Sequence, residues 1–448
     1  MLRYYTRLAL MSFRRNPGLT LLMILAIALG ISSCVMTITV YHAESANPIW
    51  WKSDRLFNVH LDPLPTNAPP SENHPGLGEI QLTYHDARYL VGANIAPHAV
   101  MGFKTSSVIS LGGASGTRAH PLKTRVTTAD FFTMFDAPFR FGGGWKAEAD
   151  WAPEPVIVLS HFENQRLFGG ANSVGRTVRW HDKDFRVVGV LDRWRPTPKF
   201  YDLNNYPFEA IEGAFVPMGW APALKLLSAG NSNCWGAGTE LKSYEAYMQS
   251  DCAWMQLWLE LPDAASVQRA QAFLENYHAE QQKLGRFGRS NPQYLYNVEE
   301  WLKALDIAGS DNRVLIGLAA AFLVVCLINT VGLLLARFLK AAPIAGVRRA
   351  LGASRRQIFI QHLIEVGVVS AAGALLSIPL SWLGMWGLRV LYATSDFDQP
   401  DGPPDLTHID ITSVSAAILL AIAATLIAGL YPAWRAGRIN PAAYLKSQ

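Results

Sequence analysis

The chain has 448 residues, of which 50% are hydrophobic and only 17% are charged. Soluble domains carry about 25% charged residues, so this composition excludes a disordered or collagen-like chain and disfavours a wholly soluble enzyme. The formal net charge is +4, and four cysteines are too few for a disulfide scaffold or a zinc-ribbon protein.

Residues 1–16 predict an amphipathic helix on the inner surface of a membrane. Phe13 lies on its apolar face, at helical spacing from positions 2, 5 and 9. The opposite face is basic and carries Arg3, Arg7 and Arg14. Such a helix would lie along the headgroups and turn into the membrane at Asn16-Pro17, whereas the alternative is a disordered basic lead.

Four stretches contain no Asp, Glu, Lys or Arg, namely Gly18–Tyr41, Val314–Ala336, Val366–Leu388 and Ile411–Ala433. A bilayer core about 30 Å thick needs a helix of roughly 20 apolar residues, and each stretch is long enough. We therefore predict transmembrane helices over 17–41, 314–337, 358–390 and 411–433. The first stretch also resembles a signal sequence, with a lipoprotein-like box at Ile31–Cys34, but its apolar run continues to Tyr41 and favours a span.

The charges between these stretches predict their orientation. Basic residues precede the first span, lie between the second and third, and follow the fourth, whereas the loop at 391–410 carries five aspartates. Because cytoplasmic loops are enriched in Lys and Arg, we predict that segments 338–357 and 434–448 and both termini are cytoplasmic. Segments 42–313 and 391–410 then lie outside. The positive net charge is thus a mark of membrane orientation and gives no support for nucleic-acid binding.

The external segment 42–313 has the pattern of a soluble α+β domain. Strand-like runs bounded by turn residues occur at Pro155–Ser160, Thr177–Trp180 and Phe185–Leu191. Helix-like runs occur at Thr128–Phe135, His161–Phe168 and Ala264–Leu284. Two Pro- and Gly-rich regions, Pro63–Gly78 and Lys199–Asn233, predict long loops or subdomain joins. The predicted fold class is a membrane α-helical protein with four transmembrane helices and an inserted α+β extracytoplasmic domain.

Cys234 and Cys252 both lie in the external segment, where oxidising conditions let a disulfide persist. Closing a loop of this size stabilises a domain by about 3 kcal/mol. We predict that the two residues pair, and two unpaired thiols are the alternative.

The cytoplasmic segment 338–357 predicts a short helix, a tight turn and the start of a long helix. Pro343 is placed to begin the short helix and Gly352 to end it. Ser354 and Gln357 have capping-box spacing for the next helix. The short helix carries Arg348 and Arg349 beside two apolar residues, Val347 and Leu351. Binding to anionic lipid headgroups is one function for this surface, and docking into a groove on a partner is the other.

No catalytic, cofactor-binding or metal-binding pattern is evident in the sequence. Gly170–Thr177 is close to a phosphate-binding loop, but Arg176 replaces the essential lysine and a strand-like run follows where a helix should begin. Ser160 and His161 are neighbours in sequence, which does not make a catalytic dyad. The four uncharged stretches leave no Asp, Glu, Lys or Arg at mid-membrane, and we expect headgroups and water to solvate His362 and Glu365 near the inner end of the third span.

Three sets of motifs resemble the MacB/FtsX-like permeases of ABC transporters. Gly346-Val-Arg-Arg-Ala-Leu-Gly-Ala-Ser354 is similar to the cytoplasmic signature of the family. Val126–Phe132 and Val156–Val190 resemble its periplasmic core, and Tyr431–Ala436 with Pro441–Leu445 resembles its C-terminal ending. The resemblance covers nearly the whole chain. Ile344 stands where the family usually has Glu and Tyr444 where it usually has Ala, which leaves open whether two identical or two paralogous permeases pair.

The resemblance implies a multi-pass subunit of the bacterial inner (cytoplasmic) membrane, with ATP and Mg²⁺ bound by a separate cytoplasmic ABC ATPase dimer and no cofactor on this chain. The ATPase would grip residues 1–16 and the short cytoplasmic helix, through Gly346, Val347, Arg348, Arg349, Leu351, Gly352 and Arg355. Its closure would move the periplasmic domains for efflux or export. A second permease, a periplasmic adaptor and an outer-membrane channel are further expected partners, with membrane lipid around the spans.

Other functions remain open at this point. The chain could be an FtsX-like signal relay that transports nothing and controls a cell-wall hydrolase, or a permease that extracts lipoproteins. A membrane-anchored sensor or enzyme is a fourth reading, which the lack of a catalytic motif disfavours. The large external segment favours a MacB-like transporter, because the relays have smaller external domains by family resemblance.

Overall fold

The computed structural model describes residues 11, 16–69, 76–111, 119–235, 243–289, 293–307, 309–340, 342–395 and 411–437. These residues form two compact units. The helical unit takes in the described parts of Met1–Ala43, Gly309–Tyr392 and Asp405–Gln448. The inserted unit takes in those of Glu44–Ala308 and Ala393–Pro404.

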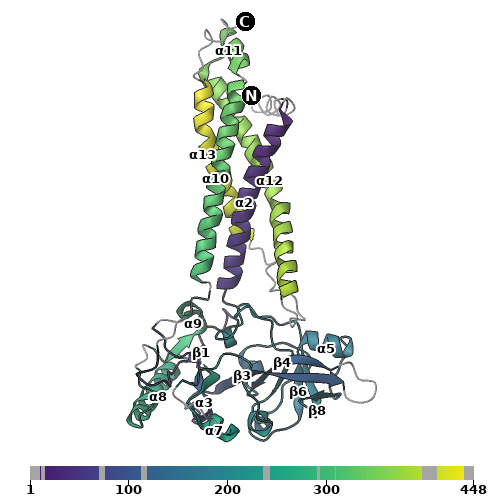
Figure 1. The fold of residues 1–448 in the computed structure, drawn as a ribbon, viewed down its shortest axis with the longest axis vertical. Coiled ribbons are helices and arrows are strands. Elements are labelled where there is room, and N and C mark those ends of the chain that lie inside the picture. The colour runs from purple at the N-terminus through teal and green to yellow at the C-terminus, as the bar shows by residue number, and fades with distance from the viewer. Residues whose placement is uncertain are drawn as a thin grey trace. The chain divides into compact units, whose positions relative to one another are not determined.

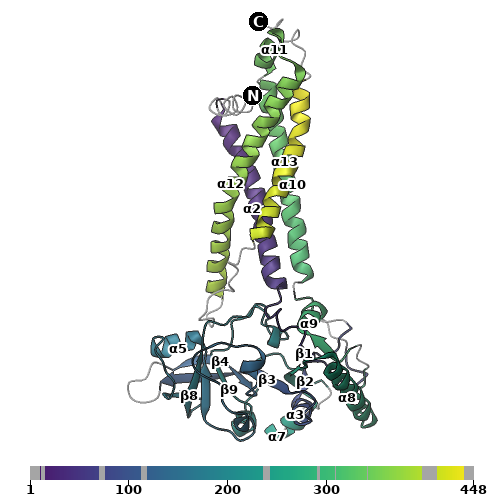
Figure 2. The same cartoon turned by 180° about the vertical axis from the view of Figure 1, so that it is seen from behind.

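The helical unit contains α2 (Pro17–Ser45), α10 (Ser310–Lys340), α11 (Ala342–Ala350), α12 (Arg355–Ser395) and α13 (Ile411–Gly437). The four long helices run along one another, and the short α11 follows the end of α10 (Figures 1 and 2). Three described helices are long and apolar enough to cross a membrane, over Pro17–Ser45, Asn312–Lys340 and Arg355–Leu388. The fourth predicted span falls within α13, and the count of four spans stays a prediction.

Close contacts between small and large apolar residues hold these helices together. Met23, Ile27, Leu334, Val366 and Val369 belong to one buried cluster contributed by α2, α10 and α12. A Cβ atom added at Gly373 of α12 would lie 2.6 Å from Ile27 Cγ2, and one added at Gly429 of α13 would lie 2.5 Å from Val366 Cγ1. Glycines therefore let the helices approach closely, which is how helices pack in lipid, where burial of apolar surface gives no driving force.

The inserted unit is built on one mixed sheet. Its strands follow the order β11-β1-β10-β3-β4-β9-β6-β8-β5, while β2 pairs with β10, and β7 pairs with β3 and β8. The strands are β1 Leu56–Val59, β2 Leu82–Thr83, β3 His98–Leu111, β4 His120–Thr127, β5 Phe139–Gly142, β6 Val156–Leu159, β7 Thr177–Trp180, β8 Lys183–Leu191, β9 Ala214–Pro217, β10 Ala253–Glu260 and β11 Leu295–Asn297. Only the β4–β9 and β6–β8 pairs among these strands are parallel.

Short helices and one long helix cover the sheet. They are α3 Tyr84–Gly92, α4 Phe131–Met134, η1 Ala147–Asp150, α5 His161–Phe168, η2 Phe200–Asp202, α6 Trp220–Ala223, α7 Tyr244–Gln249, α8 Ala264–Lys283 and α9 Val298–Ala304. The long helix α8 begins at a capping box in which Asp263 and Ser266 bond each other's backbone N–H groups. Strands and helices thus share one domain, as the α+β prediction requires.

Most predicted elements of the inserted unit are confirmed, but two regions differ. The helix predicted over Thr128–Phe135 is helical only over α4. The region Lys199–Asn233, predicted as a long loop or subdomain join, contains η2, α6 and the fully buried strand β9, which lies between β4 and β6. β9 is only four residues long and ends in Pro217, so proline and glycine around it hide the strand pattern. The sequence of Gly170–Thr177 favours a turn between two strands over a phosphate-binding loop, and the structure has a turn there that joins helix α5 to strand β7.

Candidate functional site

The junction between α10 and α12 is formed by α11 and a tight turn. Pro343 is the second residue of α11, where its missing N–H costs no helical bond. After the helix, Leu351 N donates to Val347 O at 3.0 Å and Ala353 N donates to Arg348 O at 3.0 Å. Gly352 has a φ of +100°, a conformation that other residues rarely adopt. The chain therefore reverses within the four residues that separate α11 from α12.

The start of α12 is fixed by the predicted capping box. Gln357 N donates to Ser354 Oγ at 3.2 Å, and Ser354 N donates to Gln357 Oε1 at 2.9 Å. Both exchanges satisfy N–H groups that a helix start leaves without partners. The turn and the cap together make α11, Gly352 and the first turn of α12 one hydrogen-bonded piece.

The predicted coupling residues lie together on this piece. Leu351 is 83% exposed, Val347 and Arg355 are also exposed, and Gly346 is buried. Arg349 is partly buried. Arg348 is partly buried as well, and its Nη1 donates to Gln361 Oε1 of α12 at 2.8 Å. The exposed surface is thus an apolar pair, Val347 and Leu351, flanked by Arg348, Arg349 and Arg355. We call these five residues the α11 surface.

A second feature of the helical unit was not expected from the sequence. Glu365 and His362, expected to be solvated, are buried against α10. Glu365 Oε1 lies 2.6 Å from Arg337 Nη2, and the two side chains are 5% and 2% exposed. The expectation was wrong because Arg337, just outside an uncharged stretch, turns inward instead of reaching the headgroups. No local sequence pattern pairs residues so far apart.

The inserted unit has a charged core cluster of seven residues, Lys104, Lys123, Arg125, Lys199, Asp202, Glu209 and Glu212. Lys199 is fully buried, and its Nζ lies 3.2 Å from Glu209 Oε2 and 3.4 Å from Glu212 Oε1. Arg125 Nη1 donates to Asp202 Oδ2 at 2.8 Å. Four cations thus surround three carboxylates, and the cluster ties the segment before β9 to strands β3 and β4.

The cations of the cluster keep Glu209 and Glu212 ionised despite their burial. Burial raises the pKa of Glu209, but Lys199, Lys104 and Lys123 outweigh this effect and lower the pKa to about 2. Burial also raises the pKa of Glu212, and Lys199 and Arg125 again reverse the direction. Buried charges are tolerated only when paired in this way. We assign the cluster a structural role, because its members are bonded to one another.

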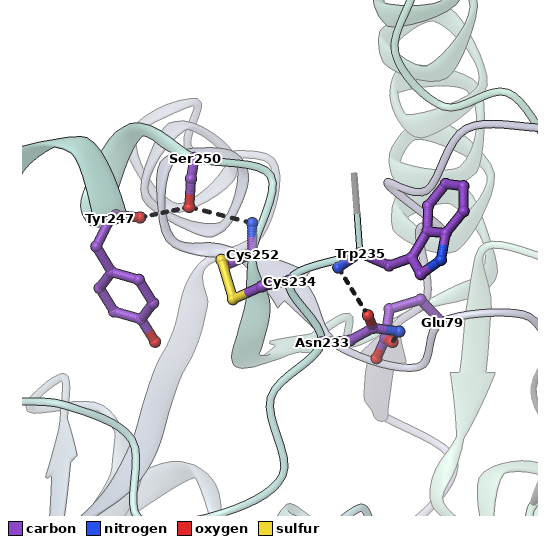
Figure 3. Close-up of a disulfide and its surroundings, with 7 residues drawn as sticks. All are labelled: Glu79, Asn233, Cys234, Trp235, Tyr247, Ser250 and Cys252. Carbon is purple, nitrogen blue, oxygen red and sulfur yellow. Dashed lines mark hydrogen bonds between the residues drawn. A yellow bond between two sulfur atoms is a disulfide. The ribbon is translucent and has the colours of Figure 1, made fainter. Parts of the chain in front are cut away.

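Cys234 and Cys252 form a disulfide in the structure (Figure 3). The neighbouring Asn233 bonds the backbone of Ala253 in both directions, and its Nδ2 donates to Glu79 Oε2 at 2.8 Å. Glu79 also accepts the N–H groups of Ile80 and Gln81. Burial raises the pKa of Glu79 to about 7, although the hydrogen bond from Asn233 acts in the opposite direction. The disulfide and the hydrogen bonds of Asn233 therefore link Glu79 to the start of β10.

The remaining predicted residues give no catalytic arrangement within the described part of the chain. Ser160 caps α5 by accepting the N–H of Glu163 at 3.1 Å, which explains why it precedes His161. Among the described residues, no group of three His, Cys, Asp or Glu side chains could hold a metal ion. The predicted residues of the amphipathic N-terminal helix, Arg3, Arg7, Phe13 and Arg14, lie outside the described residues.

Comparisons with known proteins match both units. The family model described as MacB-like periplasmic core domain matches residues 20–277, and the one described as FtsX-like permease C-terminal matches residues 316–441. The macrolide export ATP-binding/permease protein MacB of Azoarcus sp. (strain BH72) is 23% identical over 445 residues, which cover 99% of this chain and 59% of that protein. The uncharacterized ABC transporter permease YknZ of Bacillus subtilis (strain 168) is 22% identical over 445 residues, which cover 97% of this chain and 96% of that protein.

Among solved structures, the periplasmic region of MacB from Actinobacillus actinomycetemcomitans aligns with a TM-score of 0.36 and 11% identity, over 58% of this chain and 95% of that one. The chain spans 59% of the length of the Azoarcus MacB protein. The two family models together cover the inserted unit up to residue 277 and most of the later helices. This chain therefore belongs to the MacB/FtsX-like permease family of ABC transporters, and its inserted unit is a MacB-like periplasmic domain.

Proposed function

We propose that this chain is a permease subunit that converts closure of a cytoplasmic ATPase dimer into movement of its periplasmic domain, for efflux or export. ATP and Mg²⁺ bind to the ATPase partner. The chain lies in the inner membrane with both termini and α11 in the cytoplasm. A second permease, identical or paralogous, completes the membrane part, and a periplasmic adaptor and an outer-membrane channel are further partners.

The α11 surface is the observation that carries this proposal. An exposed Leu351 beside an exposed Val347 would be costly if it only faced water, and arginines on its rim suit an acidic groove. The capped turn joins this surface to α12 without a flexible link. A push on α11 would therefore be delivered to the long helix.

Two further observations support this proposal, the first of them by favouring movement of the helices over solute binding at mid-membrane. The three span candidates pack through apolar residues and glycines, which suits helices that shift as rigid bodies. Relatives whose printed names specify export, such as the Azoarcus macrolide export protein, support export over signalling.

The test uses the tagged full-length chain, purified from native membranes with whatever ATPase accompanies it. Burying a leucine contributes roughly 1.5–3 kcal/mol, so Leu351→Asp should weaken co-purification by about tenfold or more. Stimulation of ATP hydrolysis by the permease should fall in parallel. The double change Arg348→Glu with Arg349→Glu should have the same effect, because it reverses the charge of the rim.

Leu284→Asp is the matched control, because Leu284 is the C-cap residue that follows α8 in the periplasmic domain and is 73% exposed. It should change neither the co-purified ATPase nor its activity. Unaltered co-purification and stimulation in Leu351→Asp would contradict the proposed docking surface. Recovery of a peptidoglycan hydrolase in place of an adaptor would favour the signal relay instead of the exporter.

A further inference from the structure

The strongest feature outside the proposed docking surface is the ion pair between Arg337 and Glu365. This ion pair joins the C-terminal end of α10 to the N-terminal part of α12. Arg337 also contacts α2, because its Nη1 donates to Thr20 Oγ1 of that helix at 3.3 Å. One guanidinium thus contacts α2 and α12 from its position on α10.

The same level of the bundle is packed closely around this pair. His362 Nδ1 lies 3.4 Å from Glu365 Oε2, one turn away on α12. The His362 ring lies against the ring of Phe338, the residue after Arg337, with 4.1 Å between ring centroids. Both rings are buried. At this level of the bundle, α10 and α12 are therefore joined both by the Arg337–Glu365 ion pair and by the contact between the His362 and Phe338 rings.

One hydrogen bond joins α11 to α12 about one helical turn from this level. Arg348 of α11 donates to Gln361 of α12 at 2.8 Å, and Gln361 precedes His362 directly. Gln361 and Glu365 are four residues apart, about one helical turn. The contacts thus run from α11 to α12, then through Glu365 and Arg337 to α10, and from Arg337 to α2.

Stability alone is a poor explanation for this ion pair. Two charges buried at the edge of an apolar bundle lose their hydration, and replacing such a pair by apolar side chains is often neutral or stabilising. Charged groups at such positions in membrane helices usually have a functional reason. An ion pair fixes one register between two helices, whereas an apolar pair allows several.

We propose that the Arg337–Glu365 ion pair is the positioning contact that makes α12, and α11 joined to it, shift as one body with α10 and α2. This inference rests on the proposed function, in which the force arrives at α11. Thr20 extends the contact to α2, and His362 with Phe338 keeps the Glu365 carboxylate turned toward Arg337. Neither charged residue touches substrate or nucleotide in this scheme.

The first experiment needs only the permease. Spin labels are placed on Leu318→Cys of α10 and Leu375→Cys of α12, two exposed positions, after Cys34→Ala and Cys326→Ala have removed the free thiols. The distance distribution between the labels should be narrow in this background. Glu365→Gln and Arg337→Gln should each broaden it, and the reversed pair Arg337→Glu with Glu365→Arg should narrow it again.

The apolar pair Arg337→Met with Glu365→Met separates positioning from stability. We expect its thermal midpoint to equal or exceed that of the parent, while its distance distribution stays broad. Ser370→Ala is the matched control, because Ser370 is a buried polar residue of α12 whose hydroxyl donates to a carbonyl of its own helix, Val366 O, at 2.9 Å. It should leave the distribution narrow.

The second experiment measures stimulation of the co-purified ATPase by the same variants. Stimulation should fall about fivefold or more in Glu365→Gln and in the apolar pair, and return in the reversed pair. An apolar pair that keeps both a narrow distribution and full stimulation would overturn the proposal. If no ATPase accompanies the wild-type chain, the proposed function fails, and the label distances in the permease alone still decide for or against the ion pair.

Discussion

Lys199 Nζ lies 3.4 Å from Glu212 Oε1, and neither side chain is more than 1% exposed. The lysine comes just before η2 and the glutamate just before β9, so their contact closes the chain segment that feeds a central strand. Asp202 and Glu209 approach the same ammonium group. Lys199 therefore lies within ion-pair distance of all three carboxylates of the cluster.

Removing this cation should destabilise the periplasmic domain strongly. Lys199→Met leaves Glu212 buried with less compensating charge, a change that costs about 3–5 kcal/mol in other buried pairs. Lys283→Met is the matched control, because Lys283 pairs with Glu280 at 2.6 Å on the exposed surface of α8. Surface pairs contribute about 0–1 kcal/mol. Urea unfolding of the full-length chain, followed by tryptophan fluorescence, should separate the two variants, and equal midpoints would contradict the role given to Lys199.

The pH dependence of domain stability should report Glu79. Its pKa is raised from 4.5 to about 7, so the native state keeps the proton across a range in which the unfolded chain has lost it. The stabilisation is complete below pH 4.5 and is lost as pH rises toward about 7, by about 3 kcal/mol in total. Glu79→Gln should remove this decline. The variant also loses a hydrogen-bond acceptor for Asn233, which lowers the free energy of unfolding by the same amount at every pH. The diagnostic quantity is therefore the slope of stability against pH.

Unfolding midpoints at several pH values between 4.5 and 8 check this prediction. Glu280→Gln serves as a control, because Glu280 is exposed on α8. It should keep the wild-type slope. A Glu79→Gln curve that runs parallel to the wild-type curve would mean that Glu79 titrates normally in the native state.

Reduction of the Cys234–Cys252 disulfide should lower the stability of the same domain. The bond closes a loop with a sequence separation of 18, which stabilises by about 3 kcal/mol in the loop-entropy description. The chain with Cys234→Ser and Cys252→Ser should start at the lower stability and should not respond to reductant. The free Cys34 and Cys326 lie in α2 and α10, so reductant should act through the disulfide alone. A reductant effect that persists in the double variant would refute this.

The turn between α11 and α12 should not tolerate a side chain at position 352. Gly352→Ala forces alanine to a φ near +100°, at a cost of about 1–3 kcal/mol. Gly317→Ala is the matched control, because Gly317 lies within α10 and an added Cβ has nothing within 4 Å. The first variant should reduce ATPase stimulation as well as the thermal midpoint, and the second should change neither by much. Equal behaviour of the two would show that the turn is not a rigid connection.

Local signals explain what could be predicted from the sequence. Each long helix of the helical unit contains one of the uncharged stretches, and the capping box at Ser354 appears at the predicted residues because it depends on neighbours three positions apart. Helix α5 and strand β7 have their predicted bounds for the same reason. The family itself could be recognised from such short motifs, and the two family models confirm it.

Contacts between distant residues could not be predicted in this way. Arg125 of β4 bonds Gln256 of β10, 131 positions away, and nothing in either segment marks the partner. The Arg337–Glu365 pair likewise depends on how α10 and α12 pack. The Pro-rich region around β9 was predicted as a loop because a four-residue strand has too little pattern to stand out, and its position between β4 and β6 is decided by the rest of the sheet.

The two ends of the periplasmic domain meet in one pair of strands. β1, soon after the chain enters the domain, pairs antiparallel with β11, shortly before it leaves, with Phe57 opposite Asn297 and Val59 opposite Leu295. A domain whose ends are neighbours can be inserted into another chain without threading through it. The segment from 44 to 308 is thus suited to be an independently folding domain. We expect it to fold when expressed on its own. We also expect that a homologous domain can replace it without disturbing the helices on either side.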